Sequence, residues 1–242
     1  MEQPRMAIGT LNESSLHSML KRWYCERLRE QAPGVVIRTE VPRDGYVIDI
    51  VAGDELIELQ TANLGKLRPK LDCLLPDASV RVLYPIAVER VLVGARTGAA
   101  KRRRSPQRGQ LIDVLDELVS LPRYLARQGF ALEVLLIREE VRRSWNPQLR
   151  RRRGGWQTDD RSLLEVLGRY RLETPDCLWS LCEQPPRGDF DTADLAAALN
   201  GSRAAGQKLA YCLRALELIE PVGKSGNAVI YRRRQPSESA NR

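Results

Sequence analysis

The sequence predicts a mixed α/β core followed by a small module of two helices and a β-hairpin. An amphipathic helical pattern precedes several apolar β runs, and further helical patterns alternate with these runs. A segment rich in proline and glycine at residues 184–188 then separates the core from the last helical patterns. Of the 242 residues, 43% are hydrophobic and 29% are charged, which is close to the average of globular proteins and predicts an ordered core.

The first predicted helix begins near Thr10. Thr10 and Glu13 have the spacing of a capping box, and Leu16, Leu20 and Trp23 recur at helical spacing. Glu13 therefore has two interpretations. Its carboxylate accepts a helix-end amide, or it approaches a functional site, because it shares a helix face with Leu16 and Leu20.

Three β-strand patterns follow this helix. Apolar runs at residues 35–37, 45–51 and 56–60 have the composition of strands. Gly53-Asp54 lies between the last two runs, and this pair favours a two-residue hairpin turn.

A second helix is predicted at residues 68–75, where Pro69 occupies a tolerated first-turn position, and a strand follows at 80–84. The basic stretch after Gly98 pairs with residues 88–93 in a further predicted hairpin. A helix at 111–118 and a strand at 131–137 complete the first domain, which we assign to residues 1–140.

The next region is polar and arginine-rich. Residues 138–160 contain Gly154-Gly155 and little apolar content, so they are predicted to form a long loop or flexible arm. Short helical patterns follow at 163–167 and 177–181. We assign residues 141–187 as this arm and its linker helices.

The last part of the chain, residues 188–234, has two helical patterns and a hairpin. The helical patterns at 192–199 and 202–219 flank a tight turn, and the hairpin, with a glycine-rich tip, follows at 220–231. This layout resembles a winged helix-turn-helix domain, and the resemblance implies DNA contacts from the second helix and the wing. The candidate contacts are Ser202, Arg203, Gln207, Lys208, Lys224 and Arg232. A winged helix that contacts proteins is the alternative, and residues 235–242 are predicted to be disordered.

The charge of the chain favours a polyanionic partner such as DNA. Lys and Arg total 39 against 31 Asp and Glu, which gives a net charge of +8 and a pI near 9.5. The excess is concentrated at residues 101–104, 142–153 and 224–234. The sequence contains no apolar run long enough for a membrane span and no signal-peptide pattern, so we expect a cytoplasmic protein without a membrane partner.

The metal-binding options are narrow. The chain has five cysteines without a CxxC pair, which makes a disulfide framework improbable, and His17 is its single histidine. Most zinc sites are thereby excluded. A metal would have to be held by carboxylates, which favours Mg²⁺ or Mn²⁺.

Two carboxylates interrupt the apolar strands of the predicted hairpin. A turn at Gly53-Asp54 places Asp49 directly opposite Glu58, on one face. Facing anions are destabilising, and a bound divalent cation would reverse this effect. The alternatives are that each carboxylate pairs with an arginine, or that a register slip moves one of them into solvent.

A helix with Glu13, then Asp49, then Glu58-Leu59-Gln60 on the next strand resembles the PD-(D/E)XK nuclease superfamily. The resemblance implies a restriction-endonuclease-like fold, a mixed sheet flanked by helices with the order α-β-β-β-α-β. It also implies that Asp49 and Glu58 hold Mg²⁺ or Mn²⁺ for phosphodiester hydrolysis, and that Glu13 completes or orients the site. The superfamily's usual lysine is replaced by Gln60.

Nearby residues could compensate for this replacement. Lys66 or Lys70 could supply the missing cation, the alternative being that they are solvated. His17 lies one helical turn after Glu13 and either contacts substrate or is structural. The phrases at residues 8–13 and 65–71 are also similar to those of an uncharacterised bacterial family with a nuclease-like core.

The sequence therefore favours a metal-dependent DNA endonuclease-like protein that a winged helix positions on DNA. The alternative is a non-catalytic, DNA-binding transcriptional regulator whose nuclease-like core is degenerate, and Gln60 is its best argument. An RNA-processing factor would share the chemistry of the first hypothesis. A homodimer, common among site-specific nucleases, is left open.

Overall fold

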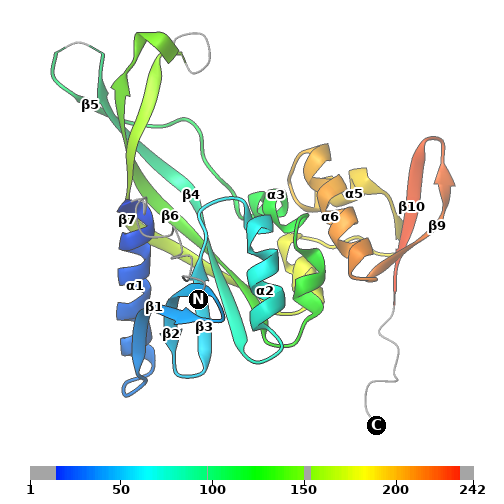
Figure 1. Ribbon diagram of the computed structural model, residues 1–242. Coiled ribbons are helices and arrows are strands. Elements are labelled where there is room, and N and C mark those ends of the chain that lie inside the picture. The colour runs from blue at the N-terminus through cyan, green and yellow to red at the C-terminus, as the bar shows by residue number, and fades with distance from the viewer. Residues whose placement is uncertain (1–14, 97, 150–153, 235–242) are drawn as a thin grey trace, which may run out of the picture.

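The structure is a computed structural model that describes residues 15–96, 98–149 and 154–234. Within these residues, the largest element is a seven-stranded sheet with the order β1-β2-β3-β4-β6-β7, to which β5 adds by pairing with β4 (Figure 1). The pairs β3–β4 and β4–β6 are parallel and the other pairs are antiparallel. The predicted mixed α/β class is confirmed.

The strands of this sheet are β1 (Ile37–Arg43), β2 (Tyr46–Ala52), β3 (Glu55–Leu59), β4 (Ser79–Ala95), β5 (Lys101–Arg104), β6 (Phe130–Trp145) and β7 (Trp156–Leu172). Its helices are α1 (Ser15–Gln31), α2 (Arg68–Leu74) and α3 (Leu115–Leu118), with the 3-10 helices η1 (Leu64–Leu67), η2 (Leu111–Val114) and η3 (Pro122–Ala126). The order α1-β1-β2-β3-α2-β4 is the predicted order. The expected capping box of Thr10 and Glu13 lies outside the described residues.

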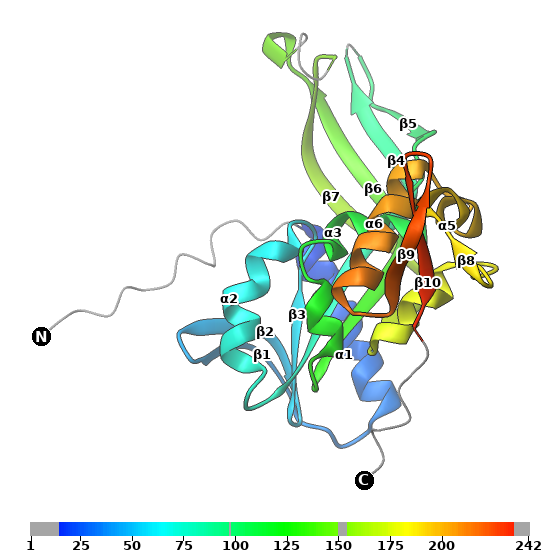
Figure 2. The same cartoon turned by 90° about the vertical axis from the view of Figure 1, so that its right-hand side faces the viewer.

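Helices cover both faces of the sheet. Leu16, Leu20 and Tyr24 of α1 are fully buried in one core cluster, together with sheet residues such as Ile57. Residues of α2 and α3, such as Leu71, belong to a second cluster on the opposite face. Figure 2 shows α1 behind the sheet and α2 and α3 in front of it. This layering follows from apolar side chains that alternate between the two faces of each strand.

The β2–β3 hairpin has the predicted register. Ala52 pairs with Glu55, Val51 with Leu56, and Ile50 with Ile57, around the turn at Gly53-Asp54. Gly53 has a φ of 59°, a left-handed conformation that glycine adopts without steric cost. The ladder ends at Ile50 and Ile57, one position before the two carboxylates.

The sheet continues beyond the body of the protein as a projecting arm, whose described residues are 88–96, 98–108, 138–149 and 154–165 (Figures 1 and 2). The predicted loop at 138–160 is wrong, because β6 extends to Trp145 and β7 begins at Trp156. The predicted helix at 163–167 is wrong as well, since these residues lie in β7. The assigned boundary at 140/141 falls within β6, so residues 141–145 and 156–172 belong to the same sheet as the body.

The predicted hairpin of residues 88–93 with the basic stretch after Gly98 is confirmed by the pairing of β4 with β5. The β6 and β7 part of the arm escapes prediction because it is a charged ribbon with little apolar alternation. Its strands are held by backbone ladders and by ion pairs between strands, such as Arg138 with Glu89 at 2.7 Å. Gly155 permits one close contact at its tip, since a Cβ there would lie 2.4 Å from the ring of Trp145.

The C-terminal module has the predicted layout of two helices and a hairpin. Its elements are η5 (Pro175–Leu181), β8 (Asp189–Phe190), α5 (Thr192–Ala198), α6 (Arg203–Ala215), β9 (Ile219–Ser225) and β10 (Ala228–Arg233). β10 lies between β8 and β9 in a three-stranded sheet of the described chain. Helix α6 ends earlier than predicted, because Glu217 has a left-handed φ of 59° and Ile219 begins β9. The predicted disordered tail lies outside the described residues.

This module packs directly on the body of the protein. Leu195 and Leu213 of the module belong to the same buried cluster as Leu115 of α3. Lys208 Nζ of α6 also lies 2.5 Å from Asp116 Oδ1 of α3. The body and the module therefore share one hydrophobic core. Among the described residues, no helix combines the length and apolarity needed to cross a membrane.

Candidate functional site

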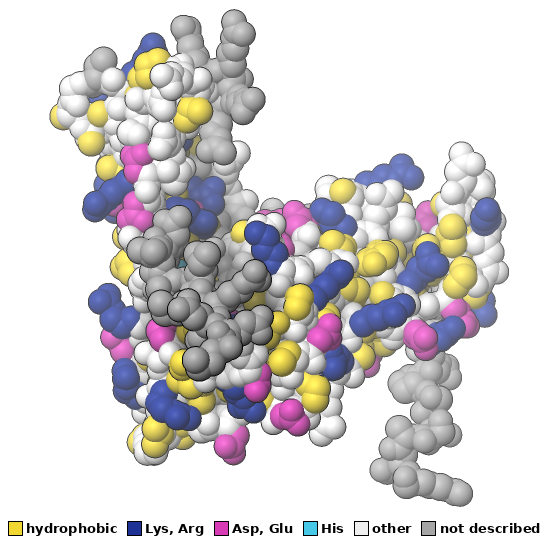
Figure 3. Space-filling view, viewed as in Figure 1, with side chains coloured by type: hydrophobic (Ala, Val, Ile, Leu, Met, Phe, Trp, Pro, Cys, Tyr) yellow, Lys and Arg dark blue, Asp and Glu magenta, His cyan; other side chains and the backbone are white. Residues whose placement is uncertain are grey.

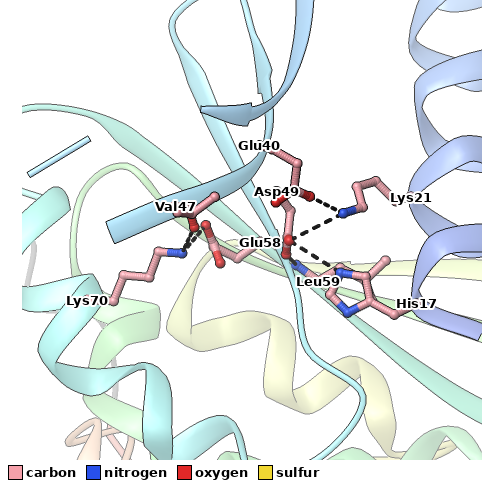
Figure 4. Close-up of polar contacts among 8 residues, drawn as sticks. All are labelled: His17, Lys21, Glu40, Val47, Asp49, Glu58, Leu59 and Lys70. Atoms are coloured by element: carbon pink, nitrogen blue, oxygen red, sulfur yellow. Dashed lines mark hydrogen bonds and ion pairs between the residues drawn. The ribbon is translucent and has the colours of Figure 1, made fainter. Parts of the chain in front are cut away.

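Asp49 lies where the β2–β3 ladder ends and is held by helix α1. Its Oδ2 accepts a hydrogen bond of 2.8 Å from the backbone N–H of Leu59. Its Oδ1 lies 3.3 Å from His17 Nε2 and 3.8 Å from Lys21 Nζ (Figure 4). Burial raises the pKa of Asp49, but the His17 ring, the Leu59 amide and Lys21 outweigh burial and lower this pKa below its usual value. Asp49 is therefore an anion at neutral pH.

Glu58 is held from helix α2 instead. Its side chain is only 6% exposed, and Lys70 Nζ lies 2.6 Å from its Oε1. Lys70 also donates a 2.6 Å hydrogen bond to the Val47 carbonyl. Burial raises the pKa of Glu58, Lys70 lowers it and the charge of Asp49 raises it further. The resulting pKa is about 7. Among the described residues, the buried Oε1 accepts no hydrogen bond of good geometry, so its contact with Lys70 is an ion pair.

The two carboxylates face opposite sides of the sheet. Ile57 and Leu59 pack in the cluster that contains α1, so Glu58 between them faces α2. Asp49 contacts α1, and Figure 4 shows Lys70 on one side of the pair and His17 and Lys21 on the other. The prediction that both side chains share one face is therefore wrong.

An irregularity in β2 explains the difference. Ile48 packs on the α2 side, whereas Ile50 packs on the α1 side, so the alternation of side chains is interrupted at Asp49. In the adjacent strand, Glu40 has a φ of 53°, and the ladder pairs Thr39 with Ile50 and Val41 with Ile48 but skips the position between them. Glu40 forms an ion pair with Lys21, which also approaches Asp49.

The other candidate site residues of the nuclease-like domain have different positions relative to Asp49 and Glu58. Lys70 is brought to Glu58, as the cation hypothesis requires, whereas Lys66 is exposed. Gln60 Nε2 donates a 2.5 Å hydrogen bond to the Ala62 carbonyl. Glu13 lies outside the described residues. The site therefore contains two carboxylates and three nitrogen-bearing side chains from α1 and α2.

The predicted DNA contacts on α6 divide between two faces of the helix. Arg203 and Gln207 are exposed and continue a stripe that includes Tyr211 and Arg214. Figure 3 shows Lys and Arg side chains among hydrophobic ones on the face that carries α6. Lys208 points toward the body instead, where it pairs with Asp116.

The remaining candidate contacts have different environments. Ser202 caps α6, since its Oγ accepts a hydrogen bond from the Ala205 amide. Arg232 makes two hydrogen bonds to Asp189, of 2.7 and 2.9 Å. Lys224 is exposed on the hairpin. Of the predicted contacts, Arg203, Gln207 and Lys224 best fit a surface that approaches a ligand.

Two fully buried carboxylates, Glu133 and Glu139, were not predicted. Glu133 accepts hydrogen bonds from Arg169 Nε at 2.5 Å and Tyr24 OH at 2.7 Å. Glu139 lies within 2.5 Å of Arg90 Nε. The signal for Glu133 was a lone glutamate in the apolar run 130–137. Both carboxylates are compensated by arginines and stabilise the sheet.

Comparison with known sequences places this geometry in a family. The profile described as "Domain of unknown function (DUF8091)" matches residues 14–173. The chain belongs to this family. The DUF8091 domain thus runs from α1 to the end of β7, so that the site and the whole arm lie inside it and the C-terminal module follows it.

The similarity to one relative extends beyond the DUF8091 domain. An uncharacterized protein of Treponema pallidum (strain Nichols) is 28% identical over 240 residues, which cover 97% of this chain and 90% of that protein. The similarity therefore includes the C-terminal module. No solved structure matches the chain.

Proposed function

We propose that this DUF8091 protein is a metal-dependent phosphodiesterase that acts on DNA. The observation that carries the proposal is the pair of largely buried carboxylates, Asp49 and Glu58, with Lys70 against Glu58. Neighbouring buried anions destabilise a fold unless cations compensate them. The order α1-β1-β2-β3-α2-β4 supports the restriction-endonuclease-like fold implied by the nuclease resemblance.

Their carboxylate oxygens make Asp49 and Glu58 candidate ligands of a hard divalent cation, but no group of three or more His, Cys, Asp or Glu side chains lies together among the described residues. Carboxylate oxygens are the ligands that Mg²⁺ and Mn²⁺ prefer, and the buried Oε1 of Glu58 has no hydrogen-bond donor in good geometry among the described residues. Asp49 and Glu58 would hold the ion. When bound, the ion would act as a Lewis acid and would lower the pKa of a water molecule bound to it, so that hydroxide would be available near neutral pH. Because the carboxylates face opposite sides of the sheet, one of them would have to leave its ion pair and turn to the side of the other before both could contact one ion.

The side chains around the carboxylates have roles that follow from their charges. Lys70 and Lys21 place cations on either side of the hairpin, where they would attract the non-bridging oxygens of a phosphodiester. With a pKa of about 7, Glu58 divides between its protonated and ionised forms near neutral pH, so it can accept or return a proton at Oε1.

The C-terminal module would position this site on the substrate. The succession β8-α5-α6-β9-β10 supports the winged-helix resemblance. The exposed stripe of α6, with Arg203, Gln207 and Arg214, offers the polar and cationic groups that contact base edges and phosphates in a groove.

A cleavage assay tests the proposal. Supercoiled plasmid and single-stranded oligonucleotides are incubated with Mg²⁺ or Mn²⁺ and the wild-type protein, Glu58→Ala, or the matched surface variant Glu26→Ala. We expect metal-dependent cleavage by the wild type and Glu26→Ala, and its loss in Glu58→Ala. Circular dichroism of each variant shows whether it is folded. Equal cleavage by all three proteins would contradict a role of Glu58.

A second candidate function is a non-catalytic, DNA-binding transcriptional regulator. Two observations favour it: each carboxylate is already paired with a lysine or histidine, and Gln60 replaces the usual lysine and donates to Ala62. DNA binding without cleavage in the same assay would support the regulator. Cleavage of RNA oligonucleotides but not of DNA would instead assign the chemistry to an RNA substrate.

A further inference from the structure

The arm carries much of the net positive charge of the protein. Its described residues, 88–96, 98–108, 138–149 and 154–165, contain 11 of the 39 Lys and Arg residues and 6 of the 31 Asp and Glu residues. Their formal net charge is therefore +5, more than half of the +8 of the whole chain. A projecting element with such an excess attracts polyanions over a distance of several ångströms.

A hollow of about 270 Å³ near the tip of the arm collects cations without a carboxylate. It is lined by Arg96, Lys101, Arg103, Arg143 and Trp156, together with small and apolar residues. Among the described residues, none of these four cations forms an ion pair with an acidic side chain. Other arginines of the arm do form such pairs, as Arg138 does with Glu89 and Glu165.

Aromatic rings hold two of these guanidiniums in place. Arg143 lies over the ring of Trp156 at 4.9 Å, and Arg96 lies over Trp145 at 4.3 Å. The two tryptophans pack edge to face with their centroids 5.6 Å apart. Such stacking leaves the N–H groups at the guanidinium edge directed outward while it limits side-chain motion. The hollow is therefore partly preorganised.

Arg143 in particular lacks compensation. Its Nε is buried and has no hydrogen-bond acceptor among the described residues. Burial lowers the pKa of Arg143, and the positive charge of Arg103 lowers it further. An anion bound in the hollow would relieve the repulsion between the two guanidiniums.

A second hollow adjoins the first along β5. It measures about 420 Å³ and shares Arg103 with the tip hollow. Arg104 and Arg108 also line it, and neither forms an ion pair among the described residues; Glu89 lines the same hollow and pairs with Arg138. The two hollows thus form a predominantly cationic track along β5.

We propose that the arm binds the sugar-phosphate backbone of a nucleic acid, with one phosphate in the tip hollow between Arg103 and Arg143. The planar guanidinium fork suits phosphate oxygens, and successive phosphates of one strand suit a track rather than a single anion site. This inference rests on the proposed function in one respect, that the partner is a nucleic acid. It does not depend on whether the protein cleaves that nucleic acid.

Salt-dependent binding tests the proposal. Fluorescence anisotropy with a labelled DNA duplex of about 30 base pairs is measured between about 0.05 and 0.3 M salt. The arm variant is Lys101→Gln/Arg103→Gln, in which both replaced side chains are exposed on β5. The matched control is Arg22→Gln/Arg29→Gln, which removes the same charge from exposed positions of α1.

We expect the arm variant to bind at least about 10-fold more weakly at 0.1 M salt and to lower the magnitude of the slope of log K against log salt by about 2. The control should stay within about 2-fold of the wild type, since it removes charge but no phosphate contact. Equal behaviour of the two variants would overturn the inference and leave the proposed function intact. No binding of DNA by the wild type, with binding to phosphatidylserine vesicles instead, would overturn both.

Discussion

Glu58 is the residue whose charge depends most directly on its surroundings. Its pKa is about 7 in the folded protein, against 4.5 for a solvated glutamate. Between pH 4.5 and about 7, Glu58 therefore keeps its proton in the folded state but has released it in the unfolded chain. A carboxyl group whose pKa is raised by folding contributes its full stability below its unfolded pKa of 4.5. It loses this contribution as the pH rises through its folded pKa of about 7.

Replacing this carboxyl by an amide should remove the pH dependence. We expect Glu58→Gln to raise the free energy of unfolding at pH 8 by about 2–3 kcal/mol over the wild type, and to change it much less at pH 5. Urea unfolding at both pH values measures the effect, and Glu26→Gln on exposed α1 is the control. A difference that is the same at pH 5 and pH 8 would contradict the assigned ionisation.

A second prediction concerns the proposed metal ligand Asp49. Mg²⁺ or Mn²⁺ should raise the thermal midpoint of the wild type, because a ligand that binds only the folded state adds about 2.7 kcal/mol at 100 times its Kd. Asp49→Asn should abolish this increase, whereas the exposed turn variant Asp54→Asn should keep it. Thermal denaturation with and without millimolar metal is the measurement. A midpoint that metal leaves unchanged would argue strongly against the site.

At the scale of elements, the tip of the arm depends on one close contact. Gly155 has a left-handed φ of 82°, and a Cβ there would lie 2.4–2.8 Å from atoms of the Trp145 ring. Gly154 also has a left-handed φ, 57°, but a Cβ there would meet nothing within 4 Å. Substitution of either glycine therefore strains the backbone, but only substitution of Gly155 also causes a steric clash.

Gly155→Ala should displace Trp145 and loosen the tip, at a local cost of about 1–3 kcal/mol beyond the strain that it shares with Gly154→Ala. Hydrogen exchange in residues 142–160 should quicken in Gly155→Ala more than in Gly154→Ala, and DNA binding should weaken in the same order. Equal exchange in the two variants would show that the ring contact does not order the tip.

For the whole molecule, the shared core predicts cooperative unfolding. Leu213 of α6 is fully buried in the same cluster as Leu115 and Leu118 of α3, so the module and the body cannot separate without exposing apolar surface. We expect a single calorimetric transition whose calorimetric and van't Hoff enthalpies agree.

Leu213→Ala checks this cooperativity, because it should destabilise the fold by about 2–5 kcal/mol and shift the entire transition. Tyr211→Ala, at an exposed position of the same helix, is the control and should shift the transition little. A variant in which only part of the transition moves would show that the module unfolds independently.

How much the sequence could predict differs from element to element. The β2–β3 hairpin was predicted with its register, because Gly53-Asp54 and the apolar runs beside it act locally. In the arm, the pairing of residues 88–93 with the basic stretch after Gly98 was predicted. Its strands β6 and β7 were not, since the arm is stabilised by cross-strand partners far apart in the sequence, such as Arg90 and Glu139. A ribbon so rich in charged residues carries little apolar alternation that would reveal it.

The candidate site shows the same division. Asp49 and Glu58 were identified as candidate residues from the strand patterns, and Lys70 from the resemblance to the nuclease superfamily. The structure brings Lys70 to Glu58. The direction of the two carboxylates was predicted wrongly. It depends on the interruption of β2 beside Glu40, and on α1 and α2 packing on opposite faces of the sheet.

By itself the sequence determined the mixed α/β class, the hairpin with its two carboxylates, the layout of the C-terminal module and the basic character of the chain. Each of these follows from interactions between neighbours along the chain or from composition. Only the tertiary structure decided which cation holds each carboxylate, that the arginine-rich segment is a paired arm, and that the module shares the core. These features depend on contacts between residues distant in the sequence, whose geometry no local pattern encodes.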